Sequence, residues 1–329
     1  MDTVKALVTG GNGFIGSHLV EYLLDEGYEV YCLVRSTSNL SLIEHLPVKL
    51  LRGDCRDRES LSDAVRGKDY IFHLAGKIKA PDWETYYASN VLGTRNLIEA
   101  CARENPDIRR FVHISSISSA GPSKKGVLKR EDEPCVPITD YGRTKLMGEE
   151  EVRKFEGRVP FVIIRPPNVL GPGNEDLLSM MKILMKRLRP AIGNGDRQTS
   201  ICFVQDLVRA IVLAATSSGA VGKTYYITDG NTYSWRFIGE VLAEELGLRG
   251  FMLPVPYPVV ILLSSLISLL SSLMGKGTMI SPERIRQLRY AYWIYDGSKA
   301  ARELGFKPVM DLQTGIKEAV KWYRKKGLL

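Results

Sequence analysis

Tyr141 and Lys145, the first and last residues of "YGRTK", have the spacing of a catalytic pair. If the stretch is helical, two side chains four residues apart lie one turn apart on the same face. Such a pair is either a catalytic acid and the cation that tunes it, or two ordinary side chains on a helix surface. The elements around the pair must decide between these interpretations.

A glycine-rich turn lies near the start of the chain. The stretch 8–19, "VTGGNGFIGSHL", places Gly10, Gly13 and Gly16 between a predicted first strand and a predicted first helix. Gly10 permits the tight turn, Gly13 lets the backbone approach a pyrophosphate, and Gly16 lets the helix pack close to the strand. The free N–H groups and the dipole at the helix start favour phosphate charge. In this context the glycine spacing predicts a dinucleotide site.

The end of the second predicted strand indicates which dinucleotide is bound. An NAD site commonly has Asp or Glu there, but no acid occurs between Glu29 and Glu44, and Arg35 ends the strand. An arginine suits a 2′-phosphate through charge-assisted hydrogen bonds. NADP(H) is therefore the preferred cofactor and NAD(H) the alternative, since an Arg35 stacked on adenine would be indifferent to the phosphate. Asp54, in "GDC", is placed to meet the adenine edge.

Apolar runs alternate with amphipathic segments along the first half of the chain. This pattern predicts an α/β fold, a Rossmann-like doubly wound parallel sheet. The predicted strands are 5–10, 29–34, 48–54, 69–76, 110–116 and 160–166, and the clearest helices are 14–27 and 83–105. A helix at 205–215 and a strand at 223–230 would return to this sheet. The predicted nucleotide-binding domain is therefore 1–169 with 205–229, and a smaller, mostly helical substrate domain comprises 170–204 and 230–329.

Composition narrows the class of protein. The 329 residues carry a net charge of +8, but no interleaving of basic and aromatic residues supports nucleic-acid binding. Solvated helix faces, or attraction for an anionic ligand or membrane surface, explain the charge instead. The five cysteines and four histidines are dispersed, so neither a disulfide framework nor a metal site is predicted. The opening "MDTVKALVTGG" enters a strand-like run at once, and we expect a cytoplasmic protein without a signal peptide.

An uncharged apolar segment occupies positions 254–275. Its longest run is shorter than the ~20 residues that a membrane span needs. It is interpreted as a buried helix of the small domain, as a lid over an apolar substrate pocket, or as a helix in peripheral contact with a membrane surface.

Taken in order, these motifs carry a family resemblance. The glycine turn, "HLAG" (73–76), "NVLGTRNL" (90–97), "ISSISSAG", "YGRTK" and "RPPNVLGPG" (165–173) resemble the extended short-chain dehydrogenase/reductase family, also called the NAD-dependent epimerase/dehydratase superfamily. The resemblance implies that Tyr141 is the acid or base. Lys145 would bond the nicotinamide ribose and lower the tyrosine pKa from its unperturbed ~10. Ser116 would hold the substrate oxygen, and Asn90 would help to order the site.

The same matches imply a set of residues that contact the dinucleotide, and members of the family are often homodimers. The dimer helices would be 83–104 and 138–156. The expected cofactor-binding residues are Gly10, Gly13, Phe14, Ile15, Gly16, Arg35, Asp54, Cys55, Leu74, Ala75, Gly76, Tyr141, Lys145, Pro167, Asn168 and Val169.

Three features bear on the branch of the family. Dehydratases typically follow the active-site Ser or Thr with Asp-Glu, whereas Ile117 and Ser118 stand here. Sugar-nucleotide enzymes usually have an arginine that clamps the diphosphate where this chain has Thr199, although Arg197 lies two residues earlier. "ISSISSAGPS" is most similar to the 3β-hydroxysteroid dehydrogenase and dihydroflavonol reductase-like branch.

We therefore expect an NAD(P)-dependent oxidoreductase that interconverts a secondary alcohol and a ketone on an apolar small-molecule substrate. The alternatives are an NDP-sugar 4-epimerase with tightly bound NAD, and a non-catalytic NADP-binding sensor or assembly protein. The last does not need Ser116, Tyr141 and Lys145 together.

Overall fold

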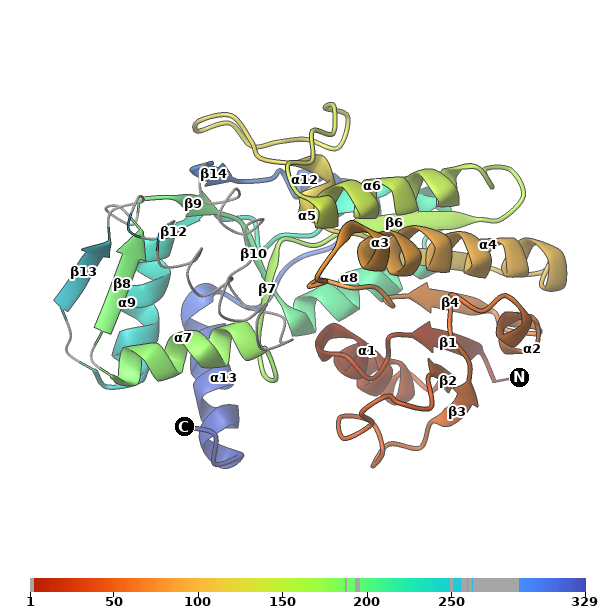
Figure 1. Ribbon diagram of the computed structural model, residues 1–329, viewed down its shortest axis with the longest axis horizontal. Helices are drawn as coiled ribbons and strands as arrows, with labels where there is room; N and C mark the ends of the chain where they lie inside the picture. The colour runs from red at the N-terminus through yellow and green to blue at the C-terminus, as the bar shows by residue number, and fades with distance from the viewer. Residues whose placement is uncertain are drawn as a thin grey trace.

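A seven-stranded parallel sheet forms the centre of the larger part of the molecule (Figure 1). The computed structural model describes residues 3–186, 188–192, 196–248, 251–255, 259, 262 and 290–329. The strand order is β11-β6-β5-β4-β1-β2-β3. The strands are β1 (Lys5–Thr9), β2 (Glu29–Val34), β3 (Lys49–Arg52), β4 (Tyr70–His73), β5 (Arg110–Ile114), β6 (Phe161–Arg165) and β11 (Thr224–Tyr226). The order reverses between β1 and β4, which is where doubly wound sheets bind their ligands.

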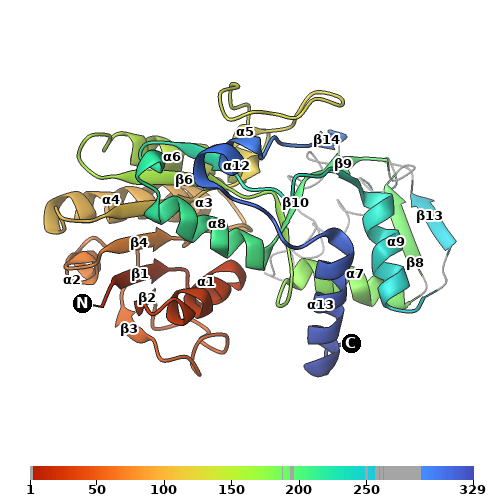
Figure 2. The same ribbon diagram turned by 180° about the vertical axis from the view of Figure 1, so that it is seen from behind.

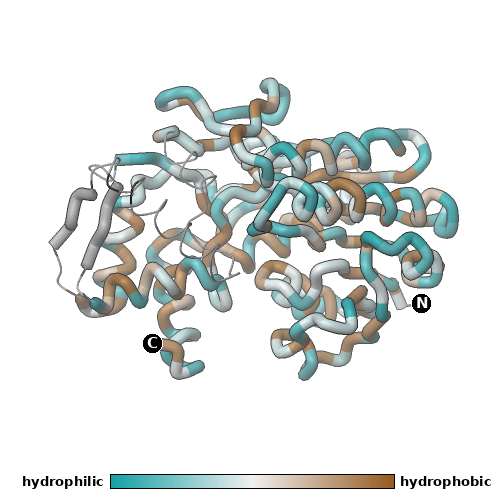
Figure 3. The backbone as a smooth tube through the Cα atoms, in the orientation of Figure 1, coloured by the Kyte–Doolittle hydropathy of each residue, from teal (hydrophilic) through white to brown (hydrophobic). Residues whose placement is uncertain are grey.

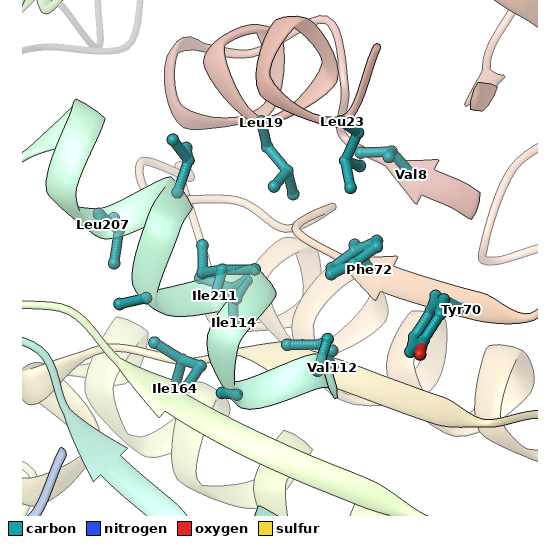
Figure 4. Packing of buried hydrophobic residues seen from close by; sticks show 14 of the residues in the cluster. Val8, Leu19, Leu23, Tyr70, Phe72, Val112, Ile114, Ile164, Leu207 and Ile211 are labelled. Carbon is teal, nitrogen blue, oxygen red and sulfur yellow. The ribbon is translucent and has the colours of Figure 1, made fainter. Parts of the chain in front are cut away.

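Helices cover both faces of this sheet, as Figures 1 and 2 show from opposite sides. Helices α1 (Phe14–Asp25) and α8 (Val204–Thr216) pack on one face, where Leu19 and Leu23 lie against Leu207, Ile211 and the strand residues (Figure 4). The other face is covered by α2 (Ser62–Val65), α4 (Gly93–Glu104) and α6 (Asp140–Arg153). Burial on both faces explains why the strands are continuous apolar runs.

The predicted helix 83–105 is interrupted in the structure. It begins as α3 (Trp83–Tyr87), passes through one π-helical turn (Ala88–Leu92) and continues as α4. π-Turns of this kind are frequent at functional sites, and this one contains Asn90.

A smaller part of the chain packs around α7 (Glu175–Met185), α9 (Trp235–Glu245) and α13 (Leu312–Lys325). Hydrophobic and hydrophilic residues alternate along these helices (Figure 3), which is the pattern of an amphipathic helix on a core. The structure adds three small sheets that the sequence does not predict, because most of their strands have only two or three residues. They are formed by β7 (Asn168–Leu170) with β10 (Ile201–Phe203), by β9 (Gln198–Thr199) with β12 (Tyr233–Ser234) and β14 (Tyr292–Trp293), and by β8 (Leu188–Ile192) with β13 (Phe251–Val255).

Two short helices lie next to strands of the seven-stranded sheet. They are α5 (Ile117–Ala120), which follows β5, and α12 (Ser298–Leu304), which packs beside β11. Residues 256–258, 260–261 and 263–275 of the apolar segment 254–275 lie outside the described residues, so its three interpretations stay predictions. Within the described part of the chain, no helix combines the length and the apolar character that a bilayer span requires.

Candidate active site

The predicted site residues come together at the carboxyl edge of the parallel sheet. Gly10 follows β1, Gly76 follows β4, Ser116 follows β5 and Pro167 follows β6. These four strands are neighbours in the sheet, and the switch point lies among them. A crevice at this position is the usual dinucleotide site of the fold.

The glycine turn has no room for side chains. Gly10 has φ +73°, and a Cβ there would lie 2.7 Å from the backbone N of Ala75. A Cβ on Gly16 would collide with the carbonyl oxygen of Gly10. The exposed Gly13 caps the first turn of α1, and its N–H donates to the Gly10 carbonyl at 3.0 Å. The cradle therefore fits a pyrophosphate that approaches the backbone closely at a helix start.

Ser116 and Tyr141 are held together by the packing of α5 against α6. Ser116 is the N-cap of α5, and its Oγ accepts a hydrogen bond from the Ser118 N–H at 3.1 Å. Tyr141 lies in the first turn of α6, and its hydroxyl is hydrogen-bonded to the Ser116 side chain. Gly142 permits this approach, because a Cβ there would collide with the Ser118 carbonyl oxygen.

The pKa of Tyr141 differs in direction from the sequence expectation. Burial raises it above 10.0, and the hydrogen bond from Ser116 acts in the opposite direction. The desolvation of the phenolate therefore outweighs the hydrogen bond from Ser116 in the free protein. The neutral phenol is the form that donates a proton to a substrate oxygen.

Lys145 is buried on the same face of α6, with 5% of its surface exposed. Its Nζ donates to the carbonyl oxygen of Ile114, at the end of β5, over 2.6 Å. Burial lowers the pKa of Lys145 from 10.5 to about 8, and the Glu149 carboxylate opposes that shift. The lysine is therefore anchored to the strand that leads into Ser116.

Asn90 ties three segments of the site together. Its Oδ1 accepts from the Lys77 N–H at 2.8 Å, and its Nδ2 donates to the Lys77 carbonyl and to Thr144 Oγ1, both at 3.1 Å. A Cβ on Gly76 would lie 2.9 Å from this same Oδ1. The π-turn thus places one amide against the loop after β4 and against α6. Its contacts within the protein are those of a residue that orders the site.

A pocket of about 400 Å³ opens at the ends of β2 and β3 and is lined by Arg35, Ser36, Thr37, Arg52, Gly53, Asp54, Arg56 and Asp57. Arg56 holds the Asp54 carboxylate through both oxygens, at 3.1 Å and 2.7 Å. Arg52 donates to the carbonyl oxygen of Arg35 at 3.2 Å. Among the described residues, neither Arg35 nor Arg52 forms an ion pair with a carboxylate.

Arg52 was not predicted from the sequence. It pairs in register with Val34, the residue before Arg35, so the two guanidinium groups stem from adjacent strands. The lengths of β2 and β3 suggest their pairing, but only the register shows that both arginines end at one pocket.

The remaining predicted cofactor residues lie along the same edge. Phe14 and Ile15 begin α1, and Leu74 and Ala75 follow β4, all partly buried. Cys55 is buried, and desolvation raises the pKa of its thiol to about 12, so the thiol is neutral at physiological pH. Pro167 is buried, while Asn168 is exposed and donates to Thr199 Oγ1 at 2.7 Å. No cluster of metal-ligating side chains occurs among the residues for which the structure gives positions.

Comparison with known proteins identifies the family. Residues 6–228, more than half of the chain, match the model of the NAD dependent epimerase/dehydratase family. This chain belongs to that family. The predictions of an extended short-chain dehydrogenase/reductase, of its Rossmann-like fold and of an enzyme of this type are confirmed at this level.

Two similar relatives fall on the expected branch of the epimerase/dehydratase family. The chain is 30% identical to "3beta-hydroxysteroid-dehydrogenase/decarboxylase isoform 2" of Arabidopsis thaliana over 95% of this chain and 61% of that protein. It is 30% identical to a "putative dihydroflavonol 4-reductase" of Synechocystis, over 97% and 94% of the two chains. This chain thus spans only 61% of the length of the Arabidopsis protein.

One similar solved structure contains a dinucleotide and a sugar nucleotide together. MoeE5, in complex with UDP-glucuronic acid and NAD, matches with a TM-score of 0.78 and 25% identity over 98% of this chain and 99% of that one. The family is therefore NAD(P)-dependent, and this neighbour binds a sugar nucleotide together with NAD.

Proposed function

We propose that the protein interconverts a secondary alcohol and a ketone on an apolar substrate, with NADP(H) as the preferred cofactor. The observation that carries the proposal is the convergence of Ser116, Tyr141 and Lys145. The Ser116–Tyr141 hydrogen bond and the anchored, buried lysine place an acid, its partner and a cation at the carboxyl edge of the sheet.

Each of the three side chains has a role that its surroundings support. Ser116 donates a hydrogen bond to the substrate oxygen and aligns it with Tyr141. Tyr141 donates its proton to that oxygen when a ketone is reduced and accepts it back when the alcohol is oxidised. Lys145 bonds the nicotinamide ribose and stabilises the phenolate once the proton has left. A bound nicotinamide supplies or accepts the hydride.

The cofactor preference is inferred from the pocket at the ends of β2 and β3. Arg35 and Arg52 line it with Ser36 and Thr37. Of its two acids, Asp54 is paired with Arg56, and Asp57 accepts a hydrogen bond from the Glu59 N–H at 3.1 Å. Two guanidinium groups that form no ion pair among the described residues suit a 2′-phosphate through charge-assisted hydrogen bonds. An NAD-specific site would instead offer a carboxylate to the ribose 2′-OH.

An apolar substrate is inferred from the branch of the family. The Arabidopsis relative is named for a hydroxysteroid and the Synechocystis relative for a dihydroflavonol. We assign the same substrate class, a lipophilic ring compound with a secondary alcohol or ketone, to this protein. The domain division, the cytoplasmic location and the homodimer through 83–104 and 138–156 stay predictions beside this assignment.

The second candidate function is an NDP-sugar 4-epimerase, which the likeness to MoeE5 favours. Where sugar-nucleotide enzymes usually have the arginine that clamps the diphosphate, this chain has Thr199. The side chain of Thr199 is buried and hydrogen-bonded to Asn168. Arg197 is partly exposed and its Nη1 lies 3.4 Å from the Tyr290 carbonyl oxygen. A diphosphate would therefore lack the bidentate contact expected at position 199.

The test begins with the dinucleotide carried by the purified protein. After denaturation, the released cofactor is identified, and the emptied protein is titrated with NADPH and NADH. A screen of steroid, terpenoid and aromatic ketones follows, with Tyr141→Phe as the matched control, for which we expect turnover to fall by about 10²–10⁴-fold. Stoichiometric NAD that survives purification, together with turnover of UDP-sugars and of no ketone, would replace the proposal with the epimerase.

The same variant addresses a non-catalytic binder. If the biological function survives in the Tyr141→Phe protein while NADPH is still bound, the protein acts as a sensor or assembly factor and the redox proposal is wrong.

A further inference from the structure

A carboxylate without access to solvent lies directly behind the proposed catalytic residues. Glu149, on α6, has an exposed fraction of 0%. Arg165, from β6, binds it through two of its three guanidinium nitrogens, with Nε to Oε1 at 2.9 Å and Nη2 to Oε2 at 2.6 Å. Ser115, just before Ser116, donates to its Oε1 at 2.5 Å, and the Oγ of Ser119, at the other end of the turn, lies 2.8 Å from the same oxygen. One side chain thus joins β5, α5, α6 and β6.

The contacts of Glu149 bear on Ser116 through the backbone. Ser119 Oγ lies within hydrogen-bond distance of the Glu149 carboxylate and also of the Ser116 carbonyl oxygen, at 2.7 Å. Ser115 donates to the same carboxylate from the residue before Ser116. Glu149 therefore fixes the turn on both sides of Ser116, through Ser115 and Ser119. This effect does not need a direct contact between Ser116 and Glu149.

Glu149 also stands one helical turn beyond Lys145, on the same face of α6. The other titratable groups around Lys145 are His73 on β4 and His113 on β5, and both are buried with their pKa lowered by burial and by this lysine. They are therefore neutral at physiological pH. Arg165 on β6 is paired with Glu149, and Tyr141 precedes Lys145 on α6. Among these groups, Glu149 supplies the negative charge that stabilises the ammonium.

We propose that Glu149 is a positioning residue that fixes the turn carrying Ser116 against the helix carrying Lys145 and keeps that lysine cationic. The predicted effect of Glu149 on turnover rests on the proposed function. Its predicted effect on the charge of Lys145 does not. A carboxylate that only stabilised the fold would change neither the pH at which Lys145 titrates nor the geometry of Ser116.

Three variants separate these effects. Glu149→Gln removes the charge and weakens the contacts to both serines. Ser119→Ala removes the link to the Ser116 carbonyl and leaves the Glu149–Arg165 pair intact. Glu151→Gln is the matched control, since it removes a carboxylate from the same helix that is also bound by an arginine, Arg95, at 3.0 Å and 2.8 Å, but on the side facing α4.

The first readout is the pH dependence of NADPH binding, measured by cofactor fluorescence, because Lys145 is expected to bond the nicotinamide ribose. For the unaltered protein we expect the dissociation constant to rise as pH passes about 8. In Glu149→Gln this rise begins about one pH unit lower, which is the size of a tenfold effect on the lysine equilibrium. In Ser119→Ala and Glu151→Gln the dissociation constant begins to rise at the same pH as in the unaltered protein.

The second readout is kcat for a ketone that the unaltered protein reduces. We expect a loss of about tenfold or more in both Glu149→Gln and Ser119→Ala, with KM for the ketone changed less, and no loss in Glu151→Gln. If Glu149→Gln does not fold, the double variant Glu149→Gln/Arg165→Gln removes both buried charges and replaces it. Its titration then shifts in the same direction by a smaller amount.

A folded Glu149→Gln protein whose NADPH-binding profile and kcat match those of the unaltered chain overturns the proposal. An equal shift in Glu151→Gln does so as well, because any carboxylate on α6 would then suffice. If no ketone is reduced by the unaltered protein, the proposed function fails, while the NADPH-binding profile still decides whether Glu149 holds the charge of Lys145.

Discussion

Replacement of Arg52 by alanine tests the assignment of the pocket at the ends of β2 and β3. Arg52 and Arg35 stem from adjacent strands and line one pocket, and within the described part of the chain neither has a carboxylate partner. If a 2′-phosphate binds between them, Arg52→Ala weakens the binding of NADPH and leaves that of NADH unchanged. The expected change is therefore in the ratio of the two dissociation constants.

The magnitude follows from the kind of contact and its exposure. A hydrogen bond that involves a charged group contributes roughly 1.5–3 kcal/mol when it is shielded from water. Arg35 and Arg52 are both exposed, so solvent and salt screen the interaction. About 1.4 kcal/mol is a reasonable expectation, which corresponds to about a tenfold loss of NADPH affinity for either single variant.

The assay is fluorescence titration of the emptied protein with NADPH and NADH at two salt concentrations. Arg66→Ala is the control, because Arg66 is also an exposed arginine beside a pocket but lies near Asp69 and Asn105, away from the switch point. Loss of selectivity in Arg35→Ala alone, with Arg52→Ala like the unaltered protein, would show that Arg52 does not contact the phosphate. Equal affinity of the unaltered protein for both cofactors would refute the reasoning for the whole pocket.

Further outcomes follow from single residues of the site. For ketone reduction, kcat/KM falls as pH rises through about 8, because Lys145 loses the proton that makes it a cation; a pH–rate profile that stays level to pH 10 contradicts this. Gly76→Ala brings a Cβ to 2.9 Å from the Asn90 amide oxygen and should lower kcat by about tenfold or more, whereas Gly239→Ala, where a Cβ meets nothing within 4 Å, should not. Arg165→Met removes the bidentate partner of the buried Glu149 carboxylate and leaves Arg153, at 3.8 Å, as its remaining ion-pair partner among the described residues. Urea unfolding should therefore show a loss of roughly 3 kcal/mol in the free energy of unfolding, and a loss below about 1 kcal/mol would mean that Arg153 or water compensates the charge.

Most of the sheet and the core of the site could be predicted from the sequence, because both depend on local patterns. The run "RFVHI" is buried along its whole length and forms β5 within the predicted segment 110–116. The glycine spacing at 10, 13 and 16 reflects contacts made within one strand-turn-helix unit. Residues that follow consecutive parallel strands must meet at one edge, so the neighbourhood of Ser116 and Gly76 needs only the strand order.

The parts that escaped prediction depend on partners far away in the chain. Nothing in "GEEEVR" predicts which glutamates are buried, yet Glu149 and Glu151 are, with Arg165 and Arg95 reaching them from β6 and α4. The π-turn at Asn90 has no marker in a helical pattern that continues on both sides of it. The raised pKa of Tyr141 was missed because it results from burial, which the sequence does not quantify.

The reductase and the epimerase use the same acid, lysine and serine, so the catalytic residues cannot distinguish the two reactions. The distinction depends on what holds the rest of the substrate and on whether the cofactor leaves. At position 199 the structure has a buried hydroxyl that binds Asn168 on the neighbouring segment, and an arginine there would have to displace that contact. At the ends of β2 and β3, two arginines that form no ion pair within the described part of the chain favour a phosphorylated ribose, which an epimerase that retains NAD does not need. Position 199 and the pocket at the ends of β2 and β3 thus favour the reductase, each through its own set of contacts.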